Sequence, residues 1–160
     1  MQIGFDHYTI AHRDLDVESV YRLAVELGAG GVQFLEPAAL DASLDPERLA
    51  AIRASADNHG LYFEVGLPSP NPIRRARMEG RPVSNEKHAR DLITHVEAAA
   101  ALGVPHARVY IGDRHERFRT NPSWNEVLAE TLDVLRRLVP VLRGNRLRVA
   151  IETHADVTVE

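Results

Sequence analysis

Leu147-Arg-Val-Ala-Ile-Glu-Thr-His-Ala-Asp156 is the stretch of this chain that most constrains both its fold and its function. It begins as an apolar β-strand and ends in a carboxylate, Glu152, followed by an imidazole, His154. In parallel α/β proteins, functional side chains gather at the C-terminal ends of the strands. Residues two apart in a strand point to the same side of the backbone. Glu152 and His154 are therefore predicted to lie together at the functional edge of a sheet.

The rest of the chain alternates between strand-like and helix-like segments. Asp45 and Pro46 form a helix cap followed by a first-turn proline, and Gly28 and Gly103 each follow an apolar run of helical spacing. The predicted strands are residues 2–10, 31–36, 61–67, 107–111 and 147–152. The predicted helices are residues 16–27, 45–60, 85–102 and 124–142. This βαβ series predicts a parallel α/β sheet.

Two architectures fit a series of strands and helices of this length. One is a complete five-stranded doubly wound parallel sheet. The other is the first part of a (β/α)8 barrel, which needs roughly 250 residues. A doubly wound sheet usually carries a glycine-rich phosphate loop after its first strand, whereas this chain has Ala11-His-Arg-Asp-Leu-Asp16 there, without glycine. The residue pattern alone leaves both architectures open.

Composition limits the classes of partner and compartment. The chain has 160 residues, the size of one domain, and its net charge of −4 argues against a nucleic-acid partner. It contains no cysteine, which excludes disulfides and thiolate metal sites. No run approaches the roughly 20 apolar residues of a membrane span, and the N-terminus does not have the pattern of a signal peptide. We expect a cytoplasmic protein that binds neither nucleic acid nor membrane.

Several segments resemble one known family. They are Gly31-Val-Gln-Phe-Leu-Glu36, Val65-Gly-Leu-Pro68, Ala99-Ala-Ala-Leu-Gly103, Gly103-Val-Pro-His-Ala-Arg-Val-Tyr-Ile-Gly112 and Val149-Ala-Ile-Glu-Thr-His154. Their order and spacing resemble the xylose isomerase-like TIM barrels of the sugar phosphate isomerase/epimerase superfamily. The resemblance covers nearly the whole chain. It implies that residues 1–160 form a single, partial (β/α)8 TIM-barrel domain, truncated after the fifth strand.

The resemblance also implies an activity. Members of the superfamily are metal-dependent isomerases or epimerases that act on a sugar or sugar-like polyol by proton transfer next to a carbonyl. Glu152 matches the glutamate at the end of strand five that binds the divalent metal, so it is expected to be both metal ligand and catalytic residue. Mn²⁺ or Mg²⁺ is the expected ion, with Zn²⁺ or Co²⁺ as alternatives. Its remaining ligands are expected beyond residue 160, and the chain is expected to be a fragment that self-associates or forms a homo-oligomer.

Other polar residues lie near predicted strand ends. Glu36 closes strand two, His115 follows strand four in an arginine-rich segment, and His154 follows Glu152; all three are candidates for substrate binding. His88 and His95 are seven residues apart on one helix, without the i, i+4 spacing of a zinc motif, so we expect them on a solvated face.

Two further functions remain open. A truncated barrel could be a non-enzymatic subunit or interaction domain. An endonuclease IV-like DNA repair enzyme, from the same superfamily, would need histidines at the exits of strands three and four. Those exits read Gly66-Leu-Pro68 and Ile111-Gly-Asp113, without histidine, which makes a nuclease the weakest of the three.

Overall fold

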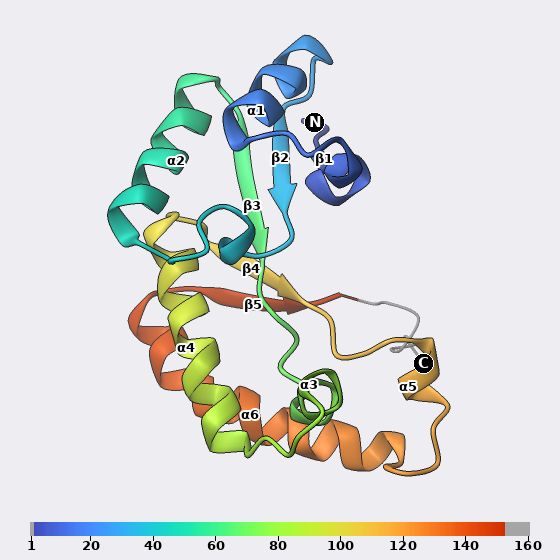
Figure 1. Ribbon diagram of the computed structural model, residues 1–160. Coiled ribbons are helices and arrows are strands. Elements are labelled where there is room, and N and C mark those ends of the chain that lie inside the picture. Colours follow the sequence, from blue (N-terminus) through green and yellow to red (C-terminus); the bar gives the residue numbers. More distant parts are fainter. Residues whose placement is uncertain (1, 153–160) are drawn as a thin grey trace.

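A computed structural model describes residues 2–152 and places five parallel strands in one open sheet, in the order β1-β2-β3-β4-β5 (Figure 1). The strands are β1 (Phe5–Asp6), β2 (Gly31–Phe34), β3 (Tyr62–Gly66), β4 (His106–Val109) and β5 (Arg148–Ile151). A doubly wound sheet would place the first strand inside the sheet, whereas β1 lies at its edge. The prediction of a partial TIM-barrel sheet is confirmed.

The strands are joined by helices whose caps can be traced to single residues. Asp45 accepts hydrogen bonds from the backbone of Glu47 and Arg48, and Ser123 forms a capping box with Glu126. The helices are α1 (Val17–Glu26), α2 (Pro46–Asn58), α3 (Pro72–Glu79), α4 (Asn85–Ala101), α5 (Arg114–Arg117) and α6 (Trp124–Gly144), with 3-10 turns η1 (His7–Arg13) and η2 (Pro37–Ala39). Within residues 2–152, no helix is long and apolar enough to cross a membrane.

Alternation along the strands separates an apolar face from a polar one. Val32, Phe34, Phe63, Val65, Ala107 and Val109 are buried and pack with α1, α2 and α4 in the main core. The residues between them, Gln33, Glu64 and Arg108, are only partly buried. Because successive strand residues point to opposite faces, these three occupy the face that a barrel turns toward its interior. The sheet therefore presents polar side chains along the inner face.

Three local features differ from the sequence prediction. Residues 2–10 were expected to form one strand, but only Phe5–Asp6 pairs with β2, because Asp6 accepts a hydrogen bond from the backbone of Tyr8 and caps the 3-10 turn η1. The predicted pattern also omitted α3 and α5, which lie in the loops after β3 and β4. Both helices shape the site described next.

Candidate functional site

The C-terminal ends of β1, β4 and β5 surround a cavity of about 380 Å³, here called the mouth cavity. Asp6 comes from the end of β1, Arg108 from β4 and Glu152 directly follows β5. Tyr110 and Asp113, from the segment after β4, line the outer part of the cavity. In a (β/α)8 barrel this end of the sheet carries the active site. The predicted catalytic residue, Glu152, therefore lies in a cavity at the expected edge.

Arg108 joins two carboxylates at the mouth cavity. Its Nη1 donates to Oε2 of Glu152 at 2.7 Å, and its Nη2 donates to Oδ2 of Asp6 at 3.1 Å. The side-chain amide of Gln33 donates to the same Asp6 oxygen at 2.9 Å. Within residues 2–152, Oε1 of Glu152 accepts no hydrogen bond, and Nε of Arg108 is buried without a partner. The network holds Glu152 by one oxygen and leaves the other available to a ligand.

The described residues do not complete a metal site. No group of three or more histidine, cysteine, aspartate or glutamate side chains between residues 2 and 152 could hold a metal ion. Hard divalent cations take about six oxygen or nitrogen ligands, several of them carboxylates or water. Glu152 and Asp6 share Arg108 as a counter-charge, so they supply at most part of such a set.

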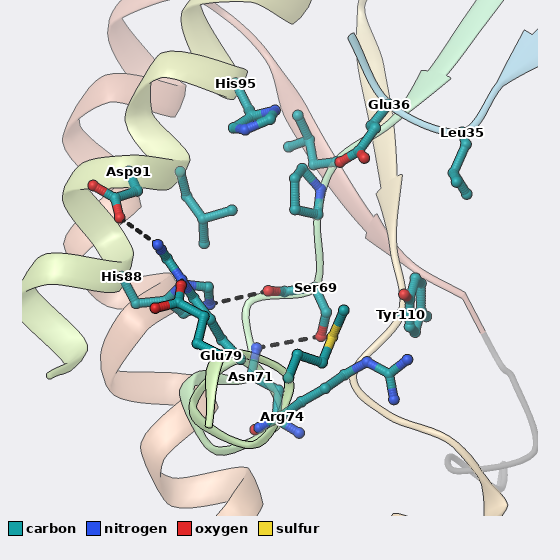
Figure 2. Close-up of a pocket in the computed structure, with 15 residues that line it drawn as sticks. Leu35, Glu36, Ser69, Asn71, Arg74, Glu79, His88, Asp91, His95 and Tyr110 are labelled. Atoms are coloured by element: carbon teal, nitrogen blue, oxygen red, sulfur yellow. Dashed lines mark hydrogen bonds and ion pairs between the residues drawn. The ribbon is translucent and has the colours of Figure 1, made fainter. Parts of the chain in front are cut away.

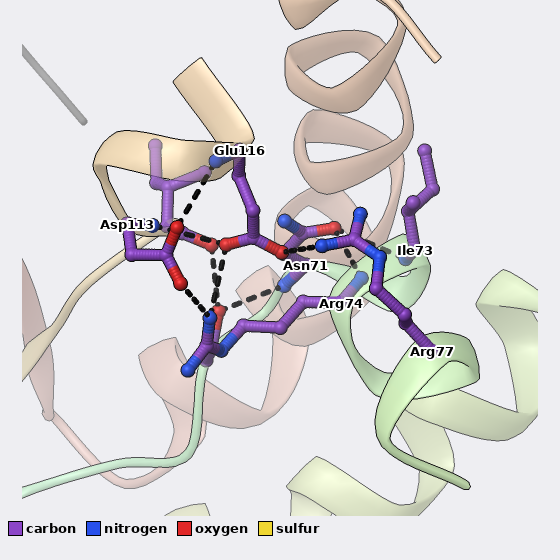
Figure 3. Close-up of polar contacts among 8 residues, drawn as sticks. Asn71, Ile73, Arg74, Arg77, Asp113 and Glu116 are labelled. Atoms are coloured by element: carbon purple, nitrogen blue, oxygen red, sulfur yellow. Dashed lines mark hydrogen bonds and ion pairs between the residues drawn. The ribbon is translucent and has the colours of Figure 1, made fainter. Parts of the chain in front are cut away.

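A buried carboxylate ties α3 to α5 beside the mouth cavity (Figure 3). Glu116 is 1% exposed and accepts from Nη1 of Arg74 at 3.0 Å and from Nη1 of Arg77 at 2.8 Å. Arg74 also pairs with Asp113 at 3.1 Å, and its guanidinium lies 5.4 Å from the centre of the Tyr110 ring. Burial raises the pKa of Asp113, but hydrogen bonds from the Glu116 backbone and from Arg74 outweigh it, so the pKa is lowered overall. These arginines are neutralised by carboxylates and do not form an anion site.

A second cavity of about 340 Å³, here called the side cavity, lies between α3, α4 and the ends of β2 and β3 (Figure 2). Glu36 from the end of β2 and His95 from α4 line it, together with Asn71, the cap of α3. Nδ2 of Asn71 and Nδ1 of His95 are buried without hydrogen-bond partners among residues 2–152. A buried polar group left unpaired costs about 1–3 kcal/mol, so this part of the fold retains unused hydrogen-bonding capacity.

The expectation that His88 and His95 lie on a solvated face was wrong. His88 is 3% exposed, because α3 and the loop before it cover that face of α4. Nδ1 of His88 accepts from Arg75 at 3.1 Å, so Nε2 carries the hydrogen and donates to the Ser69 carbonyl at 3.0 Å. Burial lowers the pKa of both His88 and His95, which favours neutral rings. His88 is a structural residue that anchors the loop before α3.

The predicted site residues do not lie together in one cavity. Glu152 lines the mouth cavity, whereas Glu36 lines the side cavity. His115 is exposed on α5 and lines neither of these cavities. His154 lies outside the described residues. The roles predicted for these four side chains stay predictions.

Sequence reasoning missed Asp6 and Arg108 as members of the site. For Arg108 a signal was present: an arginine between two apolar residues of a strand, Ala107 and Val109, must point away from the helices. Its partners could not be found in this way, because Asp6 is 102 positions away and Glu152 is 44 positions away in the chain.

Comparisons with known proteins agree with this architecture. A family model described as a xylose isomerase-like TIM barrel matches residues 21–160. Among solved structures, the crystal structure of a xylose isomerase domain protein from Planctomyces limnophilus is similar, with a TM-score of 0.58 and 18% sequence identity. The match covers 95% of this chain and 54% of that chain, so this chain spans about half of the neighbour's length. At this identity the likeness establishes the fold alone. No curated protein matched the sequence.

Proposed function

Because this chain belongs to the xylose isomerase-like TIM barrel family, we propose that the protein is a metal-dependent isomerase or epimerase of a sugar or sugar-like polyol. The observation that carries this proposal is the position of Glu152 at the end of β5, in the mouth cavity, with one carboxylate oxygen held by Arg108. A carboxylate in this position can accept a proton from a carbon next to a carbonyl. The similar solved structure is that of a xylose isomerase domain protein, which is in keeping with sugar chemistry.

The hydrogen-bonded network at the mouth cavity has a definite part in this proposal. Glu152 acts as proton acceptor or metal ligand through Oε1, because Oε2 is engaged with Arg108. Arg108 orients Glu152 and Asp6 together, and Gln33 fixes Asp6 from the neighbouring strand. This positioning matters for catalysis, because a general base must lie within hydrogen-bond distance of the group from which it takes the proton.

The metal in this proposal is Mn²⁺ or Mg²⁺, with Zn²⁺ or Co²⁺ as alternatives. Residues 2–152 do not hold a complete ligand set, so the proposal requires further ligands from outside this range. A divalent ion in such a site stabilises negative charge on a carbonyl oxygen. The substrate is a small polyhydroxylated carbonyl compound.

Removal of the Glu152 charge tests the proposal in the full-length protein. Glu152→Gln keeps the size of the side chain but weakens a hard-metal ligand, so we expect lower metal content and loss of turnover on a panel of aldoses and ketoses, with unchanged folding. Glu97→Gln, at an exposed position of α4, is the matched control and should change neither. If Glu152→Gln retains the metal stoichiometry and turnover of the native protein, the assignment of Glu152 is wrong.

One observation favours the non-enzymatic alternative, a barrel subunit or interaction domain. The edge strands β1 and β5 have neighbours on one side only among the described residues, and Ile151 of β5 is 47% exposed. Unpaired strand edges promote association with another chain. The native protein should then be an oligomer by light scattering and should contain no stoichiometric metal. Stoichiometric divalent metal together with sugar turnover would decide for the enzyme.

A further inference from the structure

The side cavity contains polar groups that the rest of the described structure leaves unpaired. The carboxylate of Glu36 makes no hydrogen bond or ion pair with any residue between 2 and 152. Nδ1 of His95 and Nδ2 of Asn71 are buried without partners in the same range. All three residues line this one cavity. They differ from the arginines of the cavity wall, which are engaged in ion pairs.

The unpaired groups are held in place. Oδ1 of Asn71 accepts from the backbone N–H groups of Ile73 and Arg74, each at 3.0 Å, so the amide cannot rotate without breaking the cap of α3. His95 lies in α4, a helix of 17 residues. Figure 2 shows the Glu36 carboxylate pointing toward the His95 ring. Burial lowers the pKa of His95, and the negative charge of Glu36 offsets part of this effect. A carboxylate and an imidazole thus face one end of the cavity.

The charges around the cavity disfavour an anionic ligand. Arg75 is paired with Glu79 at 2.6 Å and with Asp91 at 2.7 Å. Arg74 is paired with Asp113 and Glu116. Among the described residues that line the cavity, the formal charge left without a partner is therefore the negative one of Glu36. A phosphate or carboxylate would meet this charge without an available arginine.

We propose that the side cavity is a binding site for a neutral, polyhydroxylated small molecule of about monosaccharide size. Hydroxyl groups both donate and accept, so one can donate to Glu36 while another bonds to the His95 ring. Leu67, Leu92 and Met78 provide apolar wall for the carbon skeleton. The volume of about 340 Å³ lies at the lower end of the roughly 300–1,000 Å³ typical of small-molecule sites.

This site is separate from the chemistry proposed at the mouth cavity. Its unpaired groups come from the segment after β2, from α4 and from the cap of α3, whereas Glu152 directly follows β5 and does not line the side cavity. The two cavities share Leu35, Arg74 and Tyr110 in a common wall. Binding in the side cavity needs neither Glu152 nor a metal ion, so it can be tested independently of turnover.

The test is a titration of the full-length protein, labelled with ¹⁵N at histidine, in the presence of EDTA. D-fructose and D-glucose are the probes, and inorganic phosphate and ethanolamine are the charged comparisons. The His95 ring signals report occupancy of the cavity. Glu36→Ala removes the unpaired carboxylate, Glu36→Gln removes only its charge, and Glu97→Ala removes an exposed carboxylate of α4 as the matched control. Glu152→Gln separates this site from the mouth cavity.

The expected result is a saturable shift of the His95 signals by at least one sugar, in the native protein and in Glu152→Gln alike. Glu36→Ala should weaken this binding at least about tenfold, the loss expected for one charge-assisted hydrogen bond, whereas Glu97→Ala should leave it unchanged. Glu36→Gln should also weaken it, and this variant carries the test if Glu36→Ala fails to fold. Three results would overturn the proposal: no saturable shift with either sugar, equal affinity in the Glu36 variants, or binding of phosphate or ethanolamine without sugar.

Discussion

Glutamine in place of Glu116 removes the negative charge that two arginines of α3 share. The carboxylate is 1% exposed and accepts from Arg74 at 3.0 Å, from Arg77 at 2.8 Å and from the backbone N–H of Asp113 at 3.0 Å. Glutamine has nearly the same shape and keeps one acceptor oxygen, so it can still bond the Asp113 backbone. It cannot satisfy both guanidinium groups.

The magnitude follows from these contacts. A hydrogen bond to a charged group contributes about 1.5–3 kcal/mol. The side chains of Arg74 and Arg77 are 23% and 34% exposed, so water recovers part of the loss, and Arg74 keeps its pairing with Asp113. We therefore expect Glu116→Gln to lower the free energy of unfolding by about 2–3 kcal/mol, or the melting temperature by roughly 5–10 °C.

Urea unfolding followed by circular dichroism measures this change. The matched control is Glu86→Gln, which removes one partner of the ion pair with Arg90; both side chains are about 70% exposed. Exposed pairs of this i, i+4 type contribute about 0.3–0.5 kcal/mol. If Glu116→Gln is within about 0.5 kcal/mol of Glu86→Gln, the ties between α3 and α5 do not stabilise the fold as reasoned.

Three other predictions concern packing, protonation and metal affinity. Gly66→Ala should lower the free energy of unfolding by more than about 1 kcal/mol in urea, because a Cβ at this position would overlap the carbonyl oxygen of Leu35; native stability would contradict this. NMR titration should give His88 and His95 pKa values below the ordinary value of about 6.5. Below about pH 6.5 the unfolded chain then binds protons that the folded chain does not, so stability should fall as the pH is lowered from about 7.5 to about 5.5. The isolated 160-residue chain should bind Mn²⁺ only in the millimolar range, because residues 2–152 lack a complete ligand set; micromolar affinity by calorimetry would contradict this.

The parallel sheet could be predicted from the βαβ alternation, and its strand order from the resemblance to the TIM barrels, but local detail was lost where two signals compete. The prolines between Pro68 and Pro72 indicated a turn, and they do end the strand. Asn71 followed by Pro72 is also a helix start, with Asn71 capping and Pro72 in the first turn of α3. A helix of eight residues is too short for its apolar spacing to be recognised in the sequence.

Of the residues that line the mouth cavity, the sequence singled out only Glu152, which follows the fifth strand directly. Glu152 could be identified because a carboxylate that ends an apolar strand is unusual. His88 could not be placed, because its helical face was visible in the sequence but the loop that covers it was not. Its partners, the Ser69 carbonyl and the Arg75 side chain, belong to the segment around α3, whose packing against α4 depends on tertiary structure.

Arg74 lines both the mouth cavity and the side cavity. Any displacement of its guanidinium from Asp113 and Glu116 would change the shape and charge of both cavities. Equilibrium linkage makes such an effect reciprocal: occupancy of the side cavity alters affinity at the mouth by the same factor as the reverse. Because Glu116 and Asp113 hold this guanidinium, a change in the contact between α3 and α5 would reach both cavities at once.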